Sequence, residues 1–135
     1  MTEHNVVETS FYVRYAETDQ MGVVHHSSYI VWFEEGRSAW MRAMGSNYAA
    51  FESSGFNLAV SEVFARYHAS ALYGRQVTVR TWIEHVRSRS AEIRYEVIDS
   101  ESRRTLVTGY TRHICIDRAG NVVRIPEAWR DVFRA

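Results

Sequence analysis

The side chains best suited to chemistry in residues 15–37 are one aspartate and two adjacent histidines: Asp19, His25 and His26. A carboxylate can attack an activated acyl group directly, or it can take a proton from a water molecule. A nearby histidine can orient the attacking group or the carbonyl that is attacked. Each also has a structural alternative, because aspartate is a common turn residue and a histidine at a helix start is often only a satisfied polar group. Their proximity makes this stretch the first candidate for an active site.

The chain around these residues is predicted to cross from a strand, over a loop that contains Gly22, into the longest helix of the protein. Apolar residues recur at helical spacing over residues 29–44, and Gly45 supplies a natural stop. Ser27 or Ser28 is the expected N-cap, since a serine oxygen can accept a hydrogen bond from the free N–H groups of the first turn. Such N–H groups, with the positive end of the helix dipole, can stabilise an oxygen that gains negative charge during a reaction.

Other kinds of site find little support in the sequence. No metal site is predicted, because adjacent histidines rarely converge on one ion, the HxxxH spacing is absent and the other histidines lie in separate segments. The single cysteine, Cys115, excludes an intramolecular disulfide, and its alternating segment indicates a buried apolar side chain. The GxSxG, P-loop and GxGxxG signatures of serine hydrolases, nucleotide hydrolases and dinucleotide oxidoreductases are all absent.

The composition indicates one globular domain over residues 1–135. Hydrophobic residues make up 46% of the chain, which is ample for a core, and sixteen basic residues balance sixteen acidic ones. This balance gives no sign of a nucleic-acid-binding surface or of attraction to an anionic membrane. The sequence also has no apolar signal segment and no run of about eighteen apolar residues. A soluble cytoplasmic protein is therefore expected.

The remaining segments predict an antiparallel sheet. A first strand is expected at residues 10–16 and a short helical turn at residues 48–51. Four more strands are predicted over residues 57–70, 76–87, 91–99 and 105–117, and short polar connections between the last three require antiparallel hairpins. Pro126 suits the first position of a short C-terminal helix over residues 126–133. The predicted class is α+β, with five strands wrapped around one long helix that is apolar on most of its circumference.

Two motifs resemble the signature of the 4-hydroxybenzoyl-CoA thioesterase-like hotdog family, in its YbgC/FadM acyl-CoA thioesterase branch. They are YAETDQMGVVHHSSY at residues 15–29 and WFEEGR at residues 32–37, and the order of segments agrees with that family over roughly residues 8–120. The resemblance implies a hotdog fold and hydrolysis of an acyl-CoA or aroyl-CoA thioester to free acid and CoA. It implies no cofactor besides the coenzyme A of the substrate, and a homo-oligomer, either a dimer or a homotetramer, with active sites at subunit interfaces.

The resemblance also implies roles for individual residues. Asp19 matches the family's catalytic carboxylate, as nucleophile or general base, and His26 matches the histidine before the helix. The backbone N–H at or next to His26 would then donate to the thioester oxygen. His25, Gly22 and Ser27 are the further positioning candidates, and the sequence leaves open which histidine faces the substrate.

Two more groups of residues are candidates for substrate binding. Tyr29, Trp32 and Phe33 could line an acyl tunnel, although aromatic residues at helical spacing more often form the core. Arg87 and Arg89 could bind the phosphates of coenzyme A, or they could be solvated hairpin residues.

Two rival functions stay open at this point. One is a hotdog dehydratase or isomerase, and the other is a non-catalytic acyl-CoA-binding or regulatory hotdog domain. The sequence also leaves open the identity of the acyl group, a carrier-protein thioester in place of a CoA thioester, and the choice between a covalent and a general-base mechanism.

Overall fold

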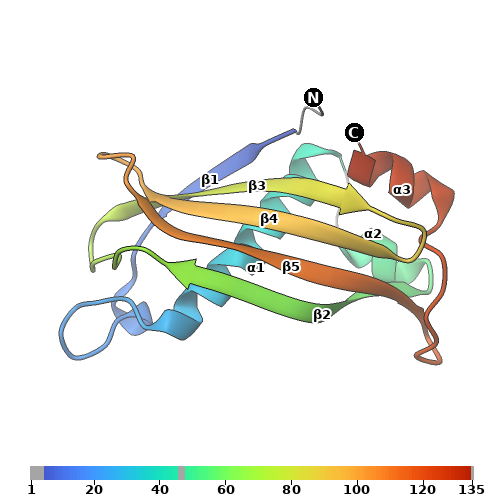
Figure 1. Cartoon of the computed structure of the whole chain (residues 1–135), viewed down its shortest axis with the longest axis horizontal. Coiled ribbons are helices and arrows are strands. Elements are labelled where there is room, and N and C mark those ends of the chain that lie inside the picture. Colours follow the sequence, from blue (N-terminus) through green and yellow to red (C-terminus); the bar gives the residue numbers. More distant parts are fainter. Residues whose placement is uncertain (1–4, 46–47, 135) are drawn as a thin grey trace.

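A computed structural model describes residues 5–45 and 48–134 of the chain (Figure 1). Nine elements follow one another in these described residues: β1 (Val7–Tyr12), the short 3-10 helix η1 (Tyr15–Glu17), α1 (His26–Ala43), α2 (Tyr48–Ser53), β2 (Phe56–Tyr67), β3 (Gln76–Val86), β4 (Ser90–Asp99), β5 (Thr105–Asp117) and α3 (Glu127–Arg134). No helix within these ranges is long and apolar enough to span a membrane.

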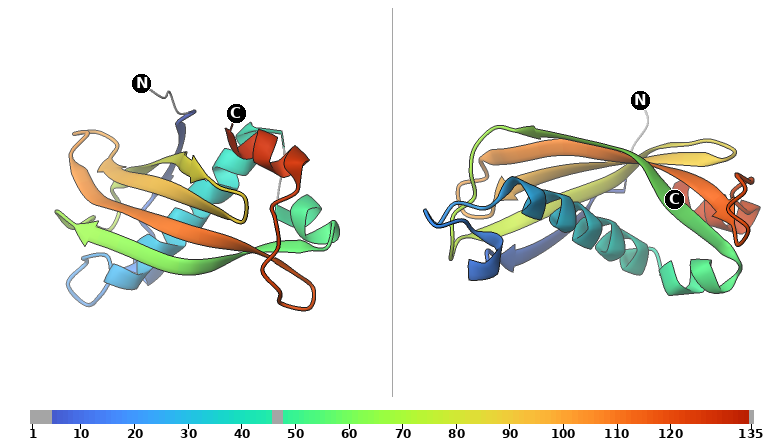
Figure 2. Two further views of the ribbon diagram at one scale, coloured as in Figure 1. Left: turned by 45° about the vertical axis from the view of Figure 1, so that its right-hand side comes forward. Right: turned by 90° about the horizontal axis from the view of Figure 1, so that it is seen from below.

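The five strands form one antiparallel sheet in the order β1-β3-β4-β5-β2, so that β1 and β2 are its edges. The register shifts between Val60 and Glu62 in β2, and between Ile83 and His85 in β3. Such β-bulges bend a strand and increase its twist. The sheet is accordingly curved, and α1 crosses one of its faces (Figure 2).

Two glycines allow α1 to lie close against this face. A Cβ at Gly36 of α1 would collide with the Thr81 hydroxyl, and a Cβ at Gly109 of β5 would come within 2.8 Å of the Phe33 ring. Phe33 instead stacks on Tyr95 of β4, with ring centroids 4.3 Å apart. The longest helix is therefore packed directly onto the centre of the sheet.

A polar chain is buried between α1 and the sheet. The hydroxyl of Thr111 lies 2.6 Å from the hydroxyl of Tyr95 and 2.8 Å from Nε2 of His113. Arg37 of α1 donates to the same Tyr95 hydroxyl at 3.4 Å. Burial, together with the nearby positive charge of Arg37, lowers the pKa of His113 to about 4, against the opposing effect of the Leu58 carbonyl. The imidazole is therefore neutral near neutral pH.

The predicted class is confirmed, and β3, β4 and β5 lie within one residue of their predicted bounds. Cys115 is buried, as its segment indicated. The predicted strand at residues 10–16 is wrong in its bounds, because β1 ends at Tyr12 and the chain turns into η1, where the Glu17 N–H donates to the Arg14 carbonyl. The strand predicted at residues 57–70 ends earlier, at Tyr67.

Candidate active site

The loop that carries Asp19 is closed on itself. An isolated bridge joins Thr18 to Val24, and the Asp19 N–H donates to the Val23 carbonyl at 2.8 Å. The exposed Asp19 carboxylate accepts two hydrogen bonds at Oδ1, from the N–H groups of Met21 at 2.8 Å and Val23 at 3.2 Å. Its second oxygen, Oδ2, accepts none from the residues that the structure describes. The carboxylate is thus held in place through one oxygen while the other stays available.

The first turn of α1 leaves one backbone donor unused. His25 is the N-cap, because its Nδ1 accepts from the Ser27 N–H at 3.2 Å and its carbonyl accepts from the Ser28 N–H at 2.9 Å. The His25 N–H itself donates to the Glu17 carbonyl at 2.9 Å. Within the described ranges, the His26 N–H has no acceptor. A free N–H at a helix N-terminus, where the helix dipole is positive, is suited to receive an oxyanion.

Glu17 joins this turn to the core. Its carboxylate accepts from Nε1 of Trp32 at 2.5 Å and from the backbone and guanidinium of Arg14 at 2.8 to 3.2 Å. Burial raises the pKa of Glu17, but the hydrogen bonds from Arg14 and Trp32 outweigh burial and hold the pKa below its usual range. An ionised Glu17 therefore anchors the start of the loop to the buried side of α1.

A groove of about 290 Å³ opens beside the free N–H group. It is lined by residues from the end of the loop, the first turn of α1 and the end of β2: Val24, His26, Tyr29, Tyr67, His68, Ala69 and Ser70. The Tyr67 hydroxyl donates to the His26 carbonyl at 3.2 Å, and the Tyr29 hydroxyl accepts from the Ala71 N–H at 2.9 Å. Burial, the largest influence, raises the pKa of Tyr29, so this hydroxyl stays protonated. The groove thus has two aromatic walls, and the free His26 N–H at its edge can donate to a carbonyl oxygen.

Comparison with known proteins places this geometry in a family. The sequence profile described as the thioesterase-like superfamily matches residues 8–133. The chain belongs to the thioesterase-like superfamily. The hotdog relationship predicted from residues 15–37 is thereby confirmed.

Similarity to individual proteins supports this assignment. The Bacillus subtilis protein YneP, which carries the name of an acyl-CoA thioesterase, is 35% identical over 106 residues, covering 78% of this chain and 76% of YneP. The solved structure of a DHNA-CoA thioesterase from Staphylococcus aureus superposes with a TM-score of 0.89 at 31% identity, over 95% of this chain and 88% of that one. A hypothetical protein from Thermus thermophilus gives a TM-score of 0.85 at 38% identity, over 96% of this chain and 94% of that one.

The structure of this thioesterase-like protein separates the roles of the two histidines. Their rings stack with centroids 4.3 Å apart, but His25 caps the helix through Ser27 whereas His26 lines the groove. The prediction that a serine is the N-cap is wrong, because the His25 imidazole takes that position and the Ser28 hydroxyl instead donates to the Glu17 carbonyl at 3.2 Å. Gly22 has a φ of +73°, which lets the loop turn back after Asp19.

The predicted substrate-binding residues are not all brought together. Of the three aromatic residues of α1, only Tyr29 lines the groove, while Trp32 and Phe33 are fully buried in the core. Arg87 and Arg89 lie at the hairpin between β3 and β4, at the opposite end of the molecule from the Asp19 loop (Figure 1). Among the described residues, no cluster of three or more histidine, cysteine, aspartate or glutamate side chains could hold a metal ion.

Two residues of the site were not predicted from the sequence. Glu17 lies two residues before Asp19 in the motif, but its role as an anchor depends on Trp32, which is fifteen residues away. Tyr67 is forty-one residues from His26, and the contact between them is made only when the chain folds.

Proposed function

We propose that this protein is an acyl-CoA thioesterase, which hydrolyses a CoA thioester to a free acid and CoA. The observation that carries the proposal is the unused His26 N–H at the start of α1, beside an open groove and close in sequence to the held Asp19 carboxylate. The names of YneP and of the Staphylococcus aureus structure support the same class of substrate. No comparable observation favours a dehydratase or a non-catalytic binding domain.

The roles follow from the chemistry of a thioester. The His26 N–H donates to the thioester carbonyl oxygen and stabilises the negative charge that it gains when the carbonyl carbon is attacked. Asp19, through its available Oδ2, attacks that carbon to form an anhydride or takes a proton from the attacking water. The CoA thiol has a pKa near ~8.5, so it leaves as a thiolate without a strong general acid.

The remaining residues position these groups. The Tyr67 hydroxyl binds the His26 carbonyl and keeps the first turn of α1 beside the groove. Nδ1 of His25 is within hydrogen-bonding distance of both the hydroxyl and the backbone N–H of Ser27. The His26 N–H is therefore left as the donor for substrate. The acyl or aroyl group packs in the groove against the rings of Tyr29 and Tyr67, which contact each other with centroids 5.4 Å apart.

We further propose that the protein acts as a homo-oligomer in the cytoplasm. The edge strand β2 is twelve residues long and carries exposed apolar side chains, with Val60 at 47% and Val63 at 44% exposure. A long apolar edge of this kind is a template for pairing with another chain. In such a pair, Arg89 in the β3–β4 hairpin of one copy could bind the phosphates of a coenzyme A whose thioester lies in the groove of the other copy.

The test is thiol release from a panel of acyl-CoA and aroyl-CoA thioesters by the wild type and by Asp19→Asn. The amide oxygen of Asn can still accept from the Met21 and Val23 N–H groups, so the loop is retained. We expect a loss of at least ~100-fold in kcat, since a positioned acid-base group contributes that much. Asp131→Asn, a change at an exposed position of α3, is the matched control and keeps full activity. No release from any substrate by the folded wild type would refute the proposal.

A further inference from the structure

The contacts of His25 specify which nitrogen of its ring carries a proton. Its Nδ1 accepts from the Ser27 N–H at 3.2 Å as the N-cap of α1, and the Ser27 hydroxyl lies 2.8 Å from the same nitrogen. An imidazole nitrogen can accept a hydrogen bond only while it carries no proton. The cap therefore requires a neutral His25 with its proton on Nε2.

Protonation of Nδ1 would remove this cap and add a charge of the wrong sign. The Ser27 N–H would face another N–H group in place of its acceptor, and the first turn of α1 would lose the hydrogen bond that an N-cap side chain provides. A positive charge is also unfavourable at a helix N-terminus, where the helix dipole is positive. Both effects act in the same direction, so the first turn is less stable when His25 is charged.

The free His26 N–H lies within this turn. His26 is the first residue of α1, and its ring stacks on that of His25 with centroids 4.3 Å apart. The Tyr67 hydroxyl holds the His26 carbonyl at 3.2 Å, and His26 lines the groove. A change in the cap or in the ring stack therefore moves the N–H relative to the groove. A displacement of about 1 Å in a positioned group can cost on the order of a hundredfold in rate.

No ion pair compensates a positive charge on His25. The titratable and charged side chains of the segments around it come from the loop before α1, the first turn of α1 and the end of β2: Arg14, Glu17, Asp19, His26, Tyr67 and His68. Glu17 is already bound by Arg14, and Asp19 is bound by two backbone N–H groups. Within the described ranges, neither carboxylate makes a hydrogen bond or ion pair with the His25 imidazole.

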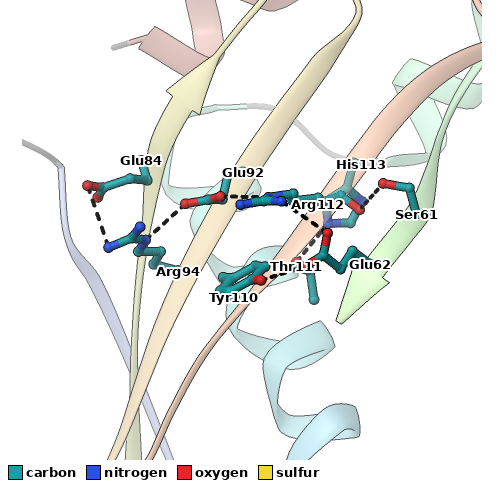
Figure 3. A network of polar contacts seen from close by, with 9 residues as sticks. All are labelled: Ser61, Glu62, Glu84, Glu92, Arg94, Tyr110, Thr111, Arg112 and His113. Atoms are coloured by element: carbon teal, nitrogen blue, oxygen red, sulfur yellow. Dashed lines mark hydrogen bonds and ion pairs between the residues drawn. The ribbon is translucent and has the colours of Figure 1, made fainter. Parts of the chain in front are cut away.

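A second titratable network lies on the sheet, with the Glu92 carboxylate between Arg94 at 3.0 Å and Arg112 at 2.9 Å (Figure 3). His113 follows Arg112 on β5 and, because side chains alternate along a strand, lies on the opposite face. The contacts drawn in Figure 3 join residues of β2, β3, β4 and β5 only. Protonation of these groups is common to the wild type and to a variant at position 25, so a comparison of the two isolates the effect of His25.

We propose that His25 is a positioning residue that places the site under the control of pH. The neutral imidazole caps α1 and aims the His26 N–H at the substrate carbonyl, and protonation of the imidazole displaces that donor. The effect on rate rests on the proposed thioesterase function, whereas the cap itself does not. Serine, asparagine and aspartate are the preferred N-caps, so what a histidine adds at this position is a charge that changes between about pH 5 and 8.

The first arm of the experiment needs no substrate. The full-length ¹⁵N-labelled protein is titrated from about pH 8 to about pH 5.5, a range in which histidines change charge, and NMR follows the imidazole nitrogens of His25 and the amide of Ser27. We expect a proton on Nε2 and none on Nδ1 at the upper pH, and a shift of the Ser27 amide with the same midpoint as the protonation of His25. A proton on Nδ1 at the upper pH, or a Ser27 amide that is indifferent to the protonation of His25, overturns the proposal.

The second arm compares kcat at the two ends of this pH range in the wild type, His25→Asn and His26→Gln. Asn offers an oxygen acceptor to the Ser27 N–H but does not titrate. As the pH falls, kcat should decrease about tenfold in the wild type and no more than about twofold in His25→Asn. His26→Gln keeps the backbone N–H and the His25 cap, so its kcat should decrease as in the wild type. KM should change less than kcat, because an oxyanion donor acts mainly in the transition state.

The two arms separate failure of this inference from failure of the proposed function. The same decrease of kcat in the wild type and His25→Asn overturns the inference, and so does a decrease that is lost only in His26→Gln. Absence of thioester hydrolysis at every pH counts against the proposed function, while the coupling of the Ser27 amide to His25 is still decided by NMR.

Discussion

Trp32 in the core donates its indole N–H to the carboxylate of Glu17, fifteen residues earlier in the chain. The carbonyl of the same Glu17 accepts from the His25 N–H at 2.9 Å and from the Ser28 hydroxyl at 3.2 Å. One residue thus connects the buried side of α1, the start of the Asp19 loop and the first turn of the helix. The position of the free His26 N–H depends on this connection.

Trp32→Phe is expected to weaken both the fold and the site. The substitution removes a hydrogen bond to a charged acceptor, which costs roughly 2 kcal/mol in free energy of unfolding. Without that bond the loop shifts relative to the helix start, and kcat for thioester hydrolysis should fall by about tenfold or more. Denaturant unfolding and thiol release measure the two effects.

The matched control is Trp82→Phe on the sheet. Trp82 also donates its indole N–H to a carboxylate, that of Glu84 at 2.8 Å, but neither residue contacts the loop. This variant should lose stability and retain kcat. An equal fall in kcat for both variants would contradict the role assigned to Glu17 and Trp32.

His113 should make the protein less stable in mild acid. Its pKa is about 4 in the folded state and near 6.5 when unfolded. As the pH falls from 6.5 towards 4, the unfolded chain takes up a proton that the folded protein does not, so the free energy of unfolding decreases. Above pH 6.5 this contribution is fully present, and over the whole interval the loss amounts to roughly 3 kcal/mol.

Denaturant unfolding of the wild type and His113→Gln between pH 7 and pH 5 tests this contribution. That range lies above the pH at which the paired carboxylates Glu17, Glu92 and Glu96, whose pKa values are lowered, lose their charge. The variant should show a flatter dependence of stability on pH, whatever its absolute stability. The same slope in both proteins would show that His113 is not the group responsible.

Pairing along β2 predicts that a charge on this edge dissociates the protein. Val63→Glu places a carboxylate in the exposed apolar row, where pairing would bury it beside the same residue of a second copy. Sedimentation velocity at micromolar concentration should show an oligomer for the wild type and a monomer for the variant. Val122→Glu, at a valine that is 51% exposed outside β2, should stay oligomeric. A monomeric wild type would argue against the proposed assembly.

Periodicity in the sequence predicted the elements whose burial pattern is regular. Alternation in residues 76–117 matches β3, β4 and β5, because each of these strands has one face on the core. The edge strands were less well bounded, because β1 ends where the chain turns into η1, and β2 ends where the N–H groups of His68 and Ala69 both donate to the Leu106 carbonyl near the start of β5. The residue propensities of a short stretch of sequence carry no information about where the chain turns away from its neighbouring strand.

For the candidate site, the sequence by itself determined which residues stand at the junction: Asp19 on a loop that contains Gly22, and His26 at the start of a long apolar helix. The tertiary structure decided what each of them does. His25 rather than a serine caps the helix, Trp32 anchors Glu17 instead of lining a pocket, and Tyr67 reaches the site from another strand. The reason is physical: a backbone donor or a polar side chain is satisfied by whichever partner packing brings within hydrogen-bonding distance, and those partners come from segments far apart in the chain.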